Sequence, residues 1–305
     1  MDGREDIGKV AFISPGPPGT SGAVVATELC AALSEHCEIE HLFVNRKNIC
    51  EESRWEGYPV RNIPFTLGQL RWWQANRKIG RYGLYHYNDK RYLPLVRYGR
   101  KPAVLTVHGL APLRDTETYP ESSRRRYRKY FRYLDEVSAV IANSKHTAGD
   151  LVETLGVPAE KIEVVYFGVN PDAYKPRDRK KAREELGIPG EAIVILNVGS
   201  ERKDKNIETM LDVFQRLSKE FDNLHLARIG DREERYTRLM KDAGLAGRII
   251  RPGRSARPSL YYNAADVYLC LDLHASFGMP NLEACLLYTS PSPRDLSTSR
   301  MPSSA

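Results

Sequence analysis

Short apolar runs alternate with helical patterns along most of this chain, and this alternation restricts it to an α/β fold with parallel sheets. Between the first two runs, Val25, Leu29 and Leu33 recur every four residues, as on one face of a helix. The pattern predicts one Rossmann-like half with strands at Val10–Ser14, Ile39–Val44, Ala103–Val107, Ala139–Asn143 and Ile162–Phe167.

A second series of the same kind follows a charged, proline-bearing segment. Its predicted strands are Ala192–Val198, Leu224–Ile229 and Asp266–Leu271. A strongly amphipathic helix is predicted between the first two of these strands, from the spacing of Ile207, Met210, Leu211, Phe214 and Leu217. Since 305 residues are about twice the usual length of a domain, we expect two domains.

Composition is that of an ordinary globular protein, with 41% hydrophobic and 28% charged residues. No apolar run is long enough to span a membrane, and the charged start lacks the core of a signal peptide, so we expect a soluble, cytoplasmic protein. The five cysteines show no CxxC spacing and are interpreted as reduced thiols. A net charge of +7 admits anionic partners without choosing among nucleotides, nucleic acids and membranes.

The last 21 residues, CLLYTSPSPRDLSTSRMPSSA, are rich in Ser and Pro and lack periodicity. Their back-translation resembles two pieces of sequencing-adapter DNA in the right order, so we interpret residues 285–305 as non-native; a disordered native tail is the alternative. We expect this tail to pack against nothing. A natural sequence cut at Ala284 would leave the second sheet incomplete, and we expect the chain as given to be poorly soluble and poorly active.

A cluster of cations lies where the amphipathic helix is predicted to start. Arg202, Lys203 and Lys205 meet a helix dipole that disfavours each of them by about 0.3 to 1 kcal/mol. A bound phosphate would remove the conflict. The alternative is a solvated surface cluster, partly offset by Glu201 and Asp204.

The string SFGMPNLEA has features of a ligand-binding helix start. Gly278 allows a close approach to the backbone, and Pro280 suits a first helical turn. Glu283 would lie near that turn, where a carboxylate can accept two sugar hydroxyls. Its ordinary alternative role is to stabilise the helix start.

These residues carry a resemblance. HASFGMPNLEA is similar to the motif E-G-F-G-x-P-x-x-E of retaining, nucleotide-sugar-dependent glycosyltransferases of the family 4-like type ("glycosyl transferases group 1"), and three further segments match. They are VIANSKHTAGDLVETLGVPAEKIEVVYFGVNPDAYKP, ILNVGSERKDKNIETMLDVF and YYNAADVYLCLD. The resemblance implies a GT-B fold, in which two Rossmann-like domains face each other across a cleft. We expect an acceptor-side domain at 1–176, a linker with a short helix at 177–190, and a partial nucleotide-sugar-binding domain at 191–284, followed by the tail at 285–305.

The resemblance also implies roles for residues of the second domain. Lys205 matches the lysine that contacts the donor diphosphate, and Arg202 supplies the accompanying guanidinium. Glu283 matches the carboxylate that binds the nucleotide ribose. Backbone amides that face the sugar and the phosphates are implied around Phe277, Gly278, Met279 and Asn281. The chain departs from the family pattern at Ala275, which replaces the motif's first glutamate, and at Ser200, which replaces an arginine.

The first domain offers His108, which follows a strand and matches the family's histidine near the transferred sugar. Ligands bind at the carboxyl ends of strands in open α/β sheets, although a lone histidine is more often structural. Gly19 and Gly22 resemble the glycine loop that approaches the donor phosphates or the acceptor, with an atypical Pro17 and Pro18 before them.

A basic run from Arg124 to Arg132 is interleaved with Tyr127, Tyr130, Phe131 and Leu134 as on one helix face. A solvated face of a core-packed helix is the favoured interpretation, and peripheral contact with anionic lipid headgroups is the alternative. Trp72 and Trp73 fit either a membrane-facing or acceptor surface or the core.

Together these features predict a retaining hexosyltransferase-type enzyme. Its partners would be a nucleoside diphosphate sugar and a glycan, lipid-linked or small-molecule acceptor, with no cofactor and no metal. A non-catalytic nucleotide-sugar or glycan-binding protein is the alternative that Ala275 and Ser200 suggest. A nucleotide-sugar epimerase is disfavoured by SFGMPNLEA, and nucleic-acid binding by the absence of a recognition motif.

Overall fold

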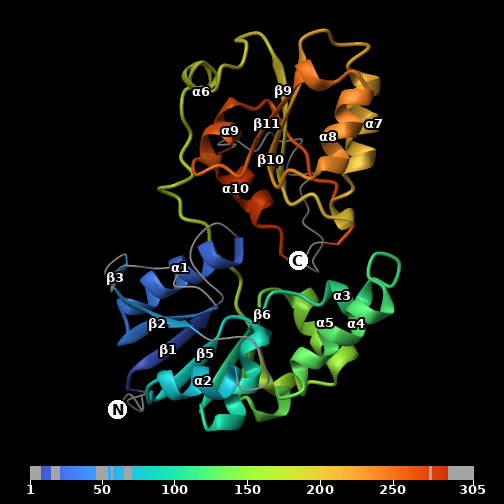
Figure 1. Cartoon of the computed structure of the whole chain (residues 1–305). Coiled ribbons are helices and arrows are strands. Elements are labelled where there is room, and N and C mark those ends of the chain that lie inside the picture. The colour runs from blue at the N-terminus through green and yellow to red at the C-terminus, as the bar shows by residue number, and fades with distance from the viewer. Residues whose placement is uncertain are drawn as a thin grey trace. The chain divides into compact units, whose positions relative to one another are not determined.

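The computed structural model describes residues 8–14, 21–45, 54–55, 58–64, 71–274 and 277–287. These residues divide into two compact units, and the division falls between Phe167 and Gly168. Each unit is built on its own sheet with helices against it (Figure 1).

The first unit holds an eight-stranded sheet in the order β3-β4-β2-β1-β5-β6-β7-β8. All neighbours are parallel except the β3–β4 pair. The chain adds strands on one side of β1 and then crosses to the other side with β5, so a topological switch point lies between β1 and β5. Its strands are β1 (Val10–Ser14), β2 (Ile39–Asn45), β3 (Arg54–Trp55), β4 (Tyr58–Pro64), β5 (Leu84–Tyr87), β6 (Ala103–Val107), β7 (Ala139–Ala142) and β8 (Ile162–Val164).

Helices of the first unit cover both faces of this sheet. Alternate residues of β1 separate the two cores: Phe12 packs with α1, and Ile13 belongs to the larger core with α2 and η1. The helices are α1 (Ser21–Ser34), α2 (Arg71–Lys78), η1 (Lys90–Tyr98), α3 (Ala111–Arg114), α4 (Glu121–Arg128), η2 (Lys129–Phe131), η3 (Leu134–Glu136), α5 (Lys145–Leu155) and η4 (Ala159–Lys161).

The second unit holds a four-stranded parallel sheet in the order β11-β10-β9-β12. Figure 1 shows α7 and α8 on one side of this sheet and α9 and α10 on the other. Its elements are α6 (Arg179–Leu186), β9 (Ile193–Gly199), η5 (Lys203–Lys205), α7 (Ile207–Leu217), β10 (Leu224–Gly230), α8 (Glu234–Asp242), η6 (Ala246–Arg248), β11 (Ile249–Gly253), α9 (Pro258–Ala264), β12 (Val267–Tyr268) and α10 (Met279–Leu287).

The amphipathic helix predicted for the second unit is confirmed as α7. Ile207, Met210, Leu211 and Phe214 are buried against the sheet, and Leu217 is partly buried in the same core. All eight predicted strands form, although β8 and β12 are shorter than predicted. Strands β3, β4, β5 and β11 were not predicted from the sequence.

Two expectations are corrected by the fold. The basic run does not form one continuous helix face, because α4 ends at Arg128 and 3-10 turns carry Phe131 and Leu134, which are buried. At the other end of the chain, α10 continues to Leu287, whose side chain is buried in the core of the second unit. The expectation that nothing after Ala284 packs is therefore wrong at Leu287, and residues 288–305 lie outside the described residues.

The two tryptophans have different environments. Trp72 packs against the larger core of the first unit, with its ring 6.1 Å from that of Tyr92. Trp73 is exposed, and the Arg77 guanidinium lies 4.8 Å from its ring centroid. Along the described part of the chain, helices are too short or too polar to cross a bilayer.

Candidate functional site

The cationic loop follows β9 at the carboxyl edge of the second sheet. Lys203–Lys205 forms the 3-10 helix η5, and Asn206 then adopts a left-handed conformation with φ of 52° before α7 begins at Ile207. The three cations therefore lie directly before α7, at the helix start where the sequence placed them. Thr209 Oγ1 donates a 2.7 Å hydrogen bond to Asn206 Oδ1, which ties the loop to the helix.

Both predicted phosphate-binding cations hold an aspartate in this structure. Arg202 donates two hydrogen bonds to Asp204, of 2.9 and 2.6 Å, and Lys205 Nζ forms an ion pair with Asp272 Oδ2. The Arg202 side chain is 57% exposed and the Lys205 side chain is 20% exposed, so the arginine has more contact with solvent than the lysine. Asp272, which lies 67 residues from Lys205 along the chain, was not found from the sequence.

Asp204 is fully buried and holds the loop after β9 in place through its side chain and its backbone. Burial favours a raised pKa for its carboxyl, but the hydrogen bonds and charge of Arg202 and the charge of Lys205 outweigh burial and hold the pKa below its ordinary value. Its backbone oxygen accepts a 2.9 Å hydrogen bond from Leu273 N. The loop after β9 is thus joined to the segment after β12.

Glu283 is the fifth residue of α10, about one turn beyond the helix start. Its Oε2 accepts a 2.7 Å hydrogen bond from the Tyr262 hydroxyl. Burial raises the pKa of Glu283, and hydrogen bonds from Tyr262 and Tyr174 oppose that shift. A half-buried carboxylate held in this way keeps acceptor capacity for hydroxyl groups of a ligand.

The start of α10 has a backbone conformation that favours glycine. Gly278 has φ of 85°, and a Cβ at this position would lie 3.0 Å from Asn281 Nδ2. Asn281 N donates a 2.9 Å hydrogen bond to Gly278 O, while Tyr268 donates a 3.1 Å hydrogen bond to Asn281 Oδ1. Phe277 precedes this turn and Met279 begins the helix. Ala275 lies outside the described residues.

The segment from Tyr268 to Leu273 connects these two groups of residues. At one end Tyr268 contacts Asn281 and lies 5.7 Å, ring to ring, from Tyr262, the partner of Glu283. At the other end Asp272 holds Lys205. Arg202 and Lys205 therefore lie next to one end of the segment from Tyr268 to Leu273, and Glu283 lies next to the other end. Two cations and a carboxylate placed in this way suit a ligand that carries both anionic and hydroxyl groups.

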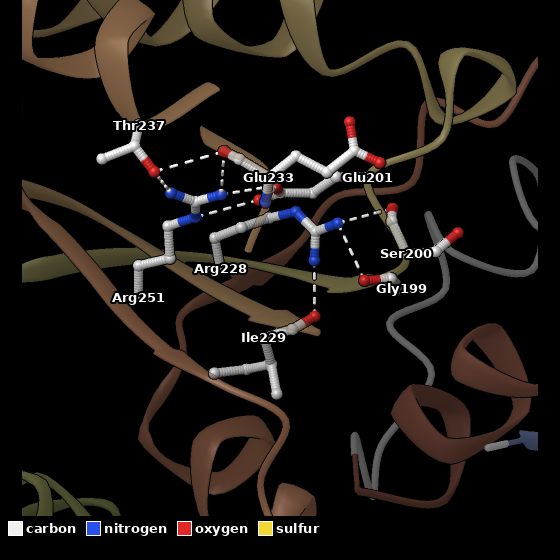
Figure 2. A network of polar contacts seen from close by, with 8 residues as sticks. All are labelled: Gly199, Ser200, Glu201, Arg228, Ile229, Glu233, Thr237 and Arg251. Atoms are coloured by element: carbon white, nitrogen blue, oxygen red, sulfur yellow. Dashed lines mark hydrogen bonds and ion pairs between the residues drawn. The ribbon is translucent and has the colours of Figure 1, made fainter. Parts of the chain in front are cut away.

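A buried polar network supports the loop after β9 (Figure 2). Glu201 does not offset the charge of Arg202; it is fully buried and forms an ion pair with Arg251 from β11, with 2.9 Å between Oε1 and Nε. Glu233 N also donates to Glu201, at 2.6 Å. Arg228 from β10 donates to the carbonyls of Gly199 and Ser200, at 2.8 and 2.7 Å. This network was not predicted from the sequence, because Arg228 lies within a segment whose pattern is that of an apolar strand.

In the first unit, His108 follows β6 as predicted. Its Nε2 lies 2.8 Å from Asn88 O and 3.1 Å from Asn88 Oδ1. Because a carbonyl oxygen only accepts, we assign the proton to Nε2, which leaves Nδ1 as the acceptor nitrogen. Burial lowers the pKa of His108, which the hydrogen bond with Asn88 opposes and the charge of Lys90 reinforces. The ring is a neutral donor and acceptor at pH 7.

Residues after β5 and β6 surround this histidine. Asn88 N donates to Ile13 O of β1, so His108 lies beside the switch point of the sheet. The Lys90 ammonium lies 4.5 Å from the ring centroid of Tyr127, and Tyr127 donates to Gly109 O at 2.8 Å. Asn88, Lys90 and Tyr127 were not predicted. Gly22 lies in the first turn of α1, and Gly19 lies outside the described residues.

Within the ranges that the structure describes, His, Cys, Asp and Glu side chains form no group of three that could hold a metal ion. Four of the five cysteines, Cys30, Cys37, Cys270 and Cys285, are free thiols. Cys50 lies outside the described residues.

Two family models match most of the chain. The model of Glycosyltransferase Family 4 matches residues 10–173, and that of Glycosyl transferases group 1 matches residues 178–289. The chain is 26% identical over 257 residues to "D-inositol 3-phosphate glycosyltransferase 2" of Catenulispora acidiphila, covering 75% of this chain and 60% of that protein. It spans 54% to 60% of the length of the first four curated relatives.

Solved glycosyltransferase structures share the fold. Anabaena Alr3699/HepE in complex with UDP and glucose aligns with a TM-score of 0.75 at 17% identity, over 91% of this chain and 78% of that one. Sucrose-phosphate synthase from Thermosynechococcus elongatus aligns with a TM-score of 0.73 at 19% identity, with the same coverage. The parallel α/β units are thus those of the GT-B fold, and since the first family model matches more than half of the 305 residues, the chain belongs to Glycosyltransferase Family 4.

Proposed function

We propose that the protein transfers a sugar from a nucleoside diphosphate sugar to a hydroxyl acceptor with retention of the anomeric configuration. The observation that carries the proposal is the carboxyl edge of the second sheet, where Arg202 and Lys205 border the same segment as Glu283. The names of the curated relatives and the UDP and glucose bound to Alr3699/HepE support it.

Lys205 and Arg202 would bind the donor diphosphate, and Glu283 would accept hydrogen bonds from the ribose hydroxyls. During transfer, the bond between the anomeric carbon and the β-phosphate oxygen breaks, and the acceptor oxygen bonds to that carbon. The acceptor proton passes to the departing phosphate oxygen. Lys205 would then stabilise the charge that develops on the leaving diphosphate, because its ammonium is already fixed before the reaction.

The proposal also covers the role of His108 and the class of acceptor. His108 of the first unit would be a neutral imidazole that hydrogen-bonds hydroxyl groups of a substrate. The acceptor class is a glycan, a lipid-linked sugar or a small polyol, and the relatives named as inositol phosphate glycosyltransferases favour a small polyol.

A donor screen tests the proposal. Purified protein is incubated with UDP-, GDP- and ADP-sugars and a panel of acceptors, and the release of nucleoside diphosphate and the anomeric configuration of the product are measured. Turnover with retention is the expected result. Binding of a nucleotide sugar without turnover of any donor would instead support the alternative, a non-catalytic binding protein, which Ser200 in place of an arginine motivates.

A further inference from the structure

Arg228 is a buried cation without an ion-pair partner in the described part of the chain. It projects from β10, is 1% exposed, and lies opposite Asn197 of β9. The nearby carboxylate of Glu201 is taken by Arg251. Burying a charge without a counter-ion costs several kcal/mol, and an apolar residue of similar size would be the more stable choice for a strand interior. The position therefore calls for a role other than packing.

The hydrogen bonds of Arg228 all go to main-chain oxygens near the loop after β9. One terminal nitrogen donates to Gly199 O and Ser200 O, at 2.8 and 2.7 Å, and the other donates to Ile229 O at 2.5 Å. Figure 2 shows the guanidinium beside the two consecutive carbonyls at the start of the loop. A single side chain thus fixes the orientation of two successive peptide groups.

Gly230 provides the space for this arrangement. It pairs with Gly199, and a Cβ on Gly230 would lie 1.7 Å from Gly199 O and 3.1 Å from an Arg228 nitrogen. Both glycines have positive φ, of 139° and 153°, which other residues adopt with strain. Two glycines and a buried arginine together turn the Gly199 carbonyl toward β10.

Turning these carbonyls inward directs the adjoining N–H groups outward. The peptide groups of Gly199–Ser200 and Ser200–Glu201 are trans, so each N–H points opposite to its carbonyl. The N–H groups of Ser200 and Glu201 therefore both point away from Arg228, and the described residues offer them no acceptor. Consecutive N–H groups directed to one side form an anion-binding concavity. Arg202 and Lys205 follow directly in the sequence.

We propose that Arg228 is a positioning residue for the diphosphate site, which holds the turn at Gly199 and Ser200 so that the N–H groups of Ser200 and Glu201 face the anion. The proposal rests on the function proposed above. The positive charge of Arg228 also favours a bound anion, since the two buried carboxylates of this loop, Glu201 and Asp204, form their ion pairs with Arg251 and Arg202. Burial lowers the pKa of Arg228, which is consistent with a charge kept away from solvent.

The test compares Arg228→Lys and Arg228→Met with Arg183→Lys and Arg183→Met in the full chain. Arg183 is a matched control, because it is a buried arginine of the same unit that bonds Ala264 O, Gly190 O and Asp266. Hydrogen–deuterium exchange of the 199–205 peptide reports the turn without any ligand. Calorimetric titration with UDP, GDP and ADP reports the anion site, and the melting temperature reports folding.

Arg228→Lys keeps the charge but cannot span the three carbonyls in the same geometry. We expect faster exchange at 199–205 and a Kd for the bound nucleotide raised about tenfold or more, as for loss of hydrogen bonds to a charged group. The Arg183 variants should lower the melting temperature without changing the exchange at 199–205 or the Kd.

If Arg228→Met does not fold, the lysine variant and the exchange data still test the proposal. Unchanged exchange and Kd in a folded Arg228→Lys protein would overturn the proposal. If the unchanged protein bound none of the three nucleotides, the proposed function would fail, and exchange would still show whether Arg228 holds the turn.

Discussion

Two charged side chains of the candidate site, Lys205 and Glu283, are held by partners that are distant in sequence. The string ERKDK predicts a phosphate site by its cations, and those cations do gather at the end of a strand. The partner of Lys205 could not be predicted, because Asp272 lies in the segment after β12 and only the sheet order brings it close. The same holds for Glu283, since its tyrosine partner lies on α9.

Replacing Lys205 with alanine removes a charge that should bind more strongly as the diphosphate leaves. We expect kcat and kcat/KM to fall together, by about 10² to 10³, rather than KM alone to rise. Steady-state kinetics with the accepted donor measures the effect. Lys203→Ala is the matched control, since Lys203 is exposed in the same 3-10 turn. Near-normal kinetics for Lys205→Ala with every accepted donor would contradict the assignment.

Glu283→Gln should behave differently. If the carboxylate binds the ribose equally in the ground and transition states, its loss raises donor KM and leaves kcat nearly unchanged.

The free energy of unfolding of Glu283→Gln should not fall at pH 7. Because burial raises the folded-state pKa of Glu283, its stabilising contribution is complete below the ordinary pKa of a glutamate and is lost as pH rises through the raised value. Because the glutamine side chain does not titrate, Glu283→Gln removes this dependence of stability on pH. Glu185→Gln on α6 is the exposed control, and a large loss of kcat in Glu283→Gln would show that the carboxylate acts in the transition state.

Elements were predictable where their pattern was long and regular. Buried parallel strands are continuous apolar runs, so β1, β6 and β9 could be located within a residue or two. β5, with the sequence LYHY, and β11, with IIRPG, are short and carry polar or proline residues, and local sequence does not distinguish them from loops. The helix predicted across the basic run ends early because 3-10 turns bury Phe131 and Leu134. Tertiary packing decides such boundaries.

The contact between β9 and β10 gives an element-scale prediction. Gly230→Ala would place a Cβ 1.7 Å from the Gly199 carbonyl oxygen, so the backbone of one strand must shift. We expect the free energy of unfolding of the second unit to fall by more than about 2 kcal/mol. Urea unfolding followed by circular dichroism measures it. Gly190→Ala serves as the control, since a Cβ there meets no atom within 4 Å. Equal stability of the two variants would exclude the close approach.

At the scale of the whole molecule, the two units distribute their buried polar groups differently. In the second unit, Glu201, Asp204 and Arg228 lie buried at the carboxyl edge of the sheet and support the candidate diphosphate site, whereas buried Arg183 bonds residues before β9 and β12. In the first unit, buried histidines lie on the sheet: His41 contacts Ser14, and His86 contacts Thr106, each at 2.7 Å. Composition could not reveal this division, because it depends on which strand face each residue occupies.

These histidines make the first unit sensitive to acid. Burial lowers the pKa of His41 to about 3 and that of His86 to about 4. An unfolded histidine has a pKa near 6.5, so as pH falls below about 6.5 the unfolded state binds protons that the folded state excludes. Stability of the first unit should therefore decrease on acidification, by about 1.4 kcal/mol per pH unit for each such histidine.

His41→Gln tests this dependence, because glutamine keeps a polar contact for Ser14 but does not titrate. All three tryptophans lie in the first unit, at positions 55, 72 and 73, so tryptophan fluorescence follows its unfolding selectively. We expect the mean slope of unfolding free energy against pH, measured in urea between pH 7 and pH 5, to decrease by about 1 kcal/mol per pH unit in the variant, because an unfolded histidine is only partly protonated near pH 7. His36→Gln, at an exposed position, should leave the slope unchanged. An identical slope in His41→Gln and the unchanged protein would mean that His41 binds its proton over the same pH range in the folded and unfolded states, which contradicts its burial between Phe12 and Phe43.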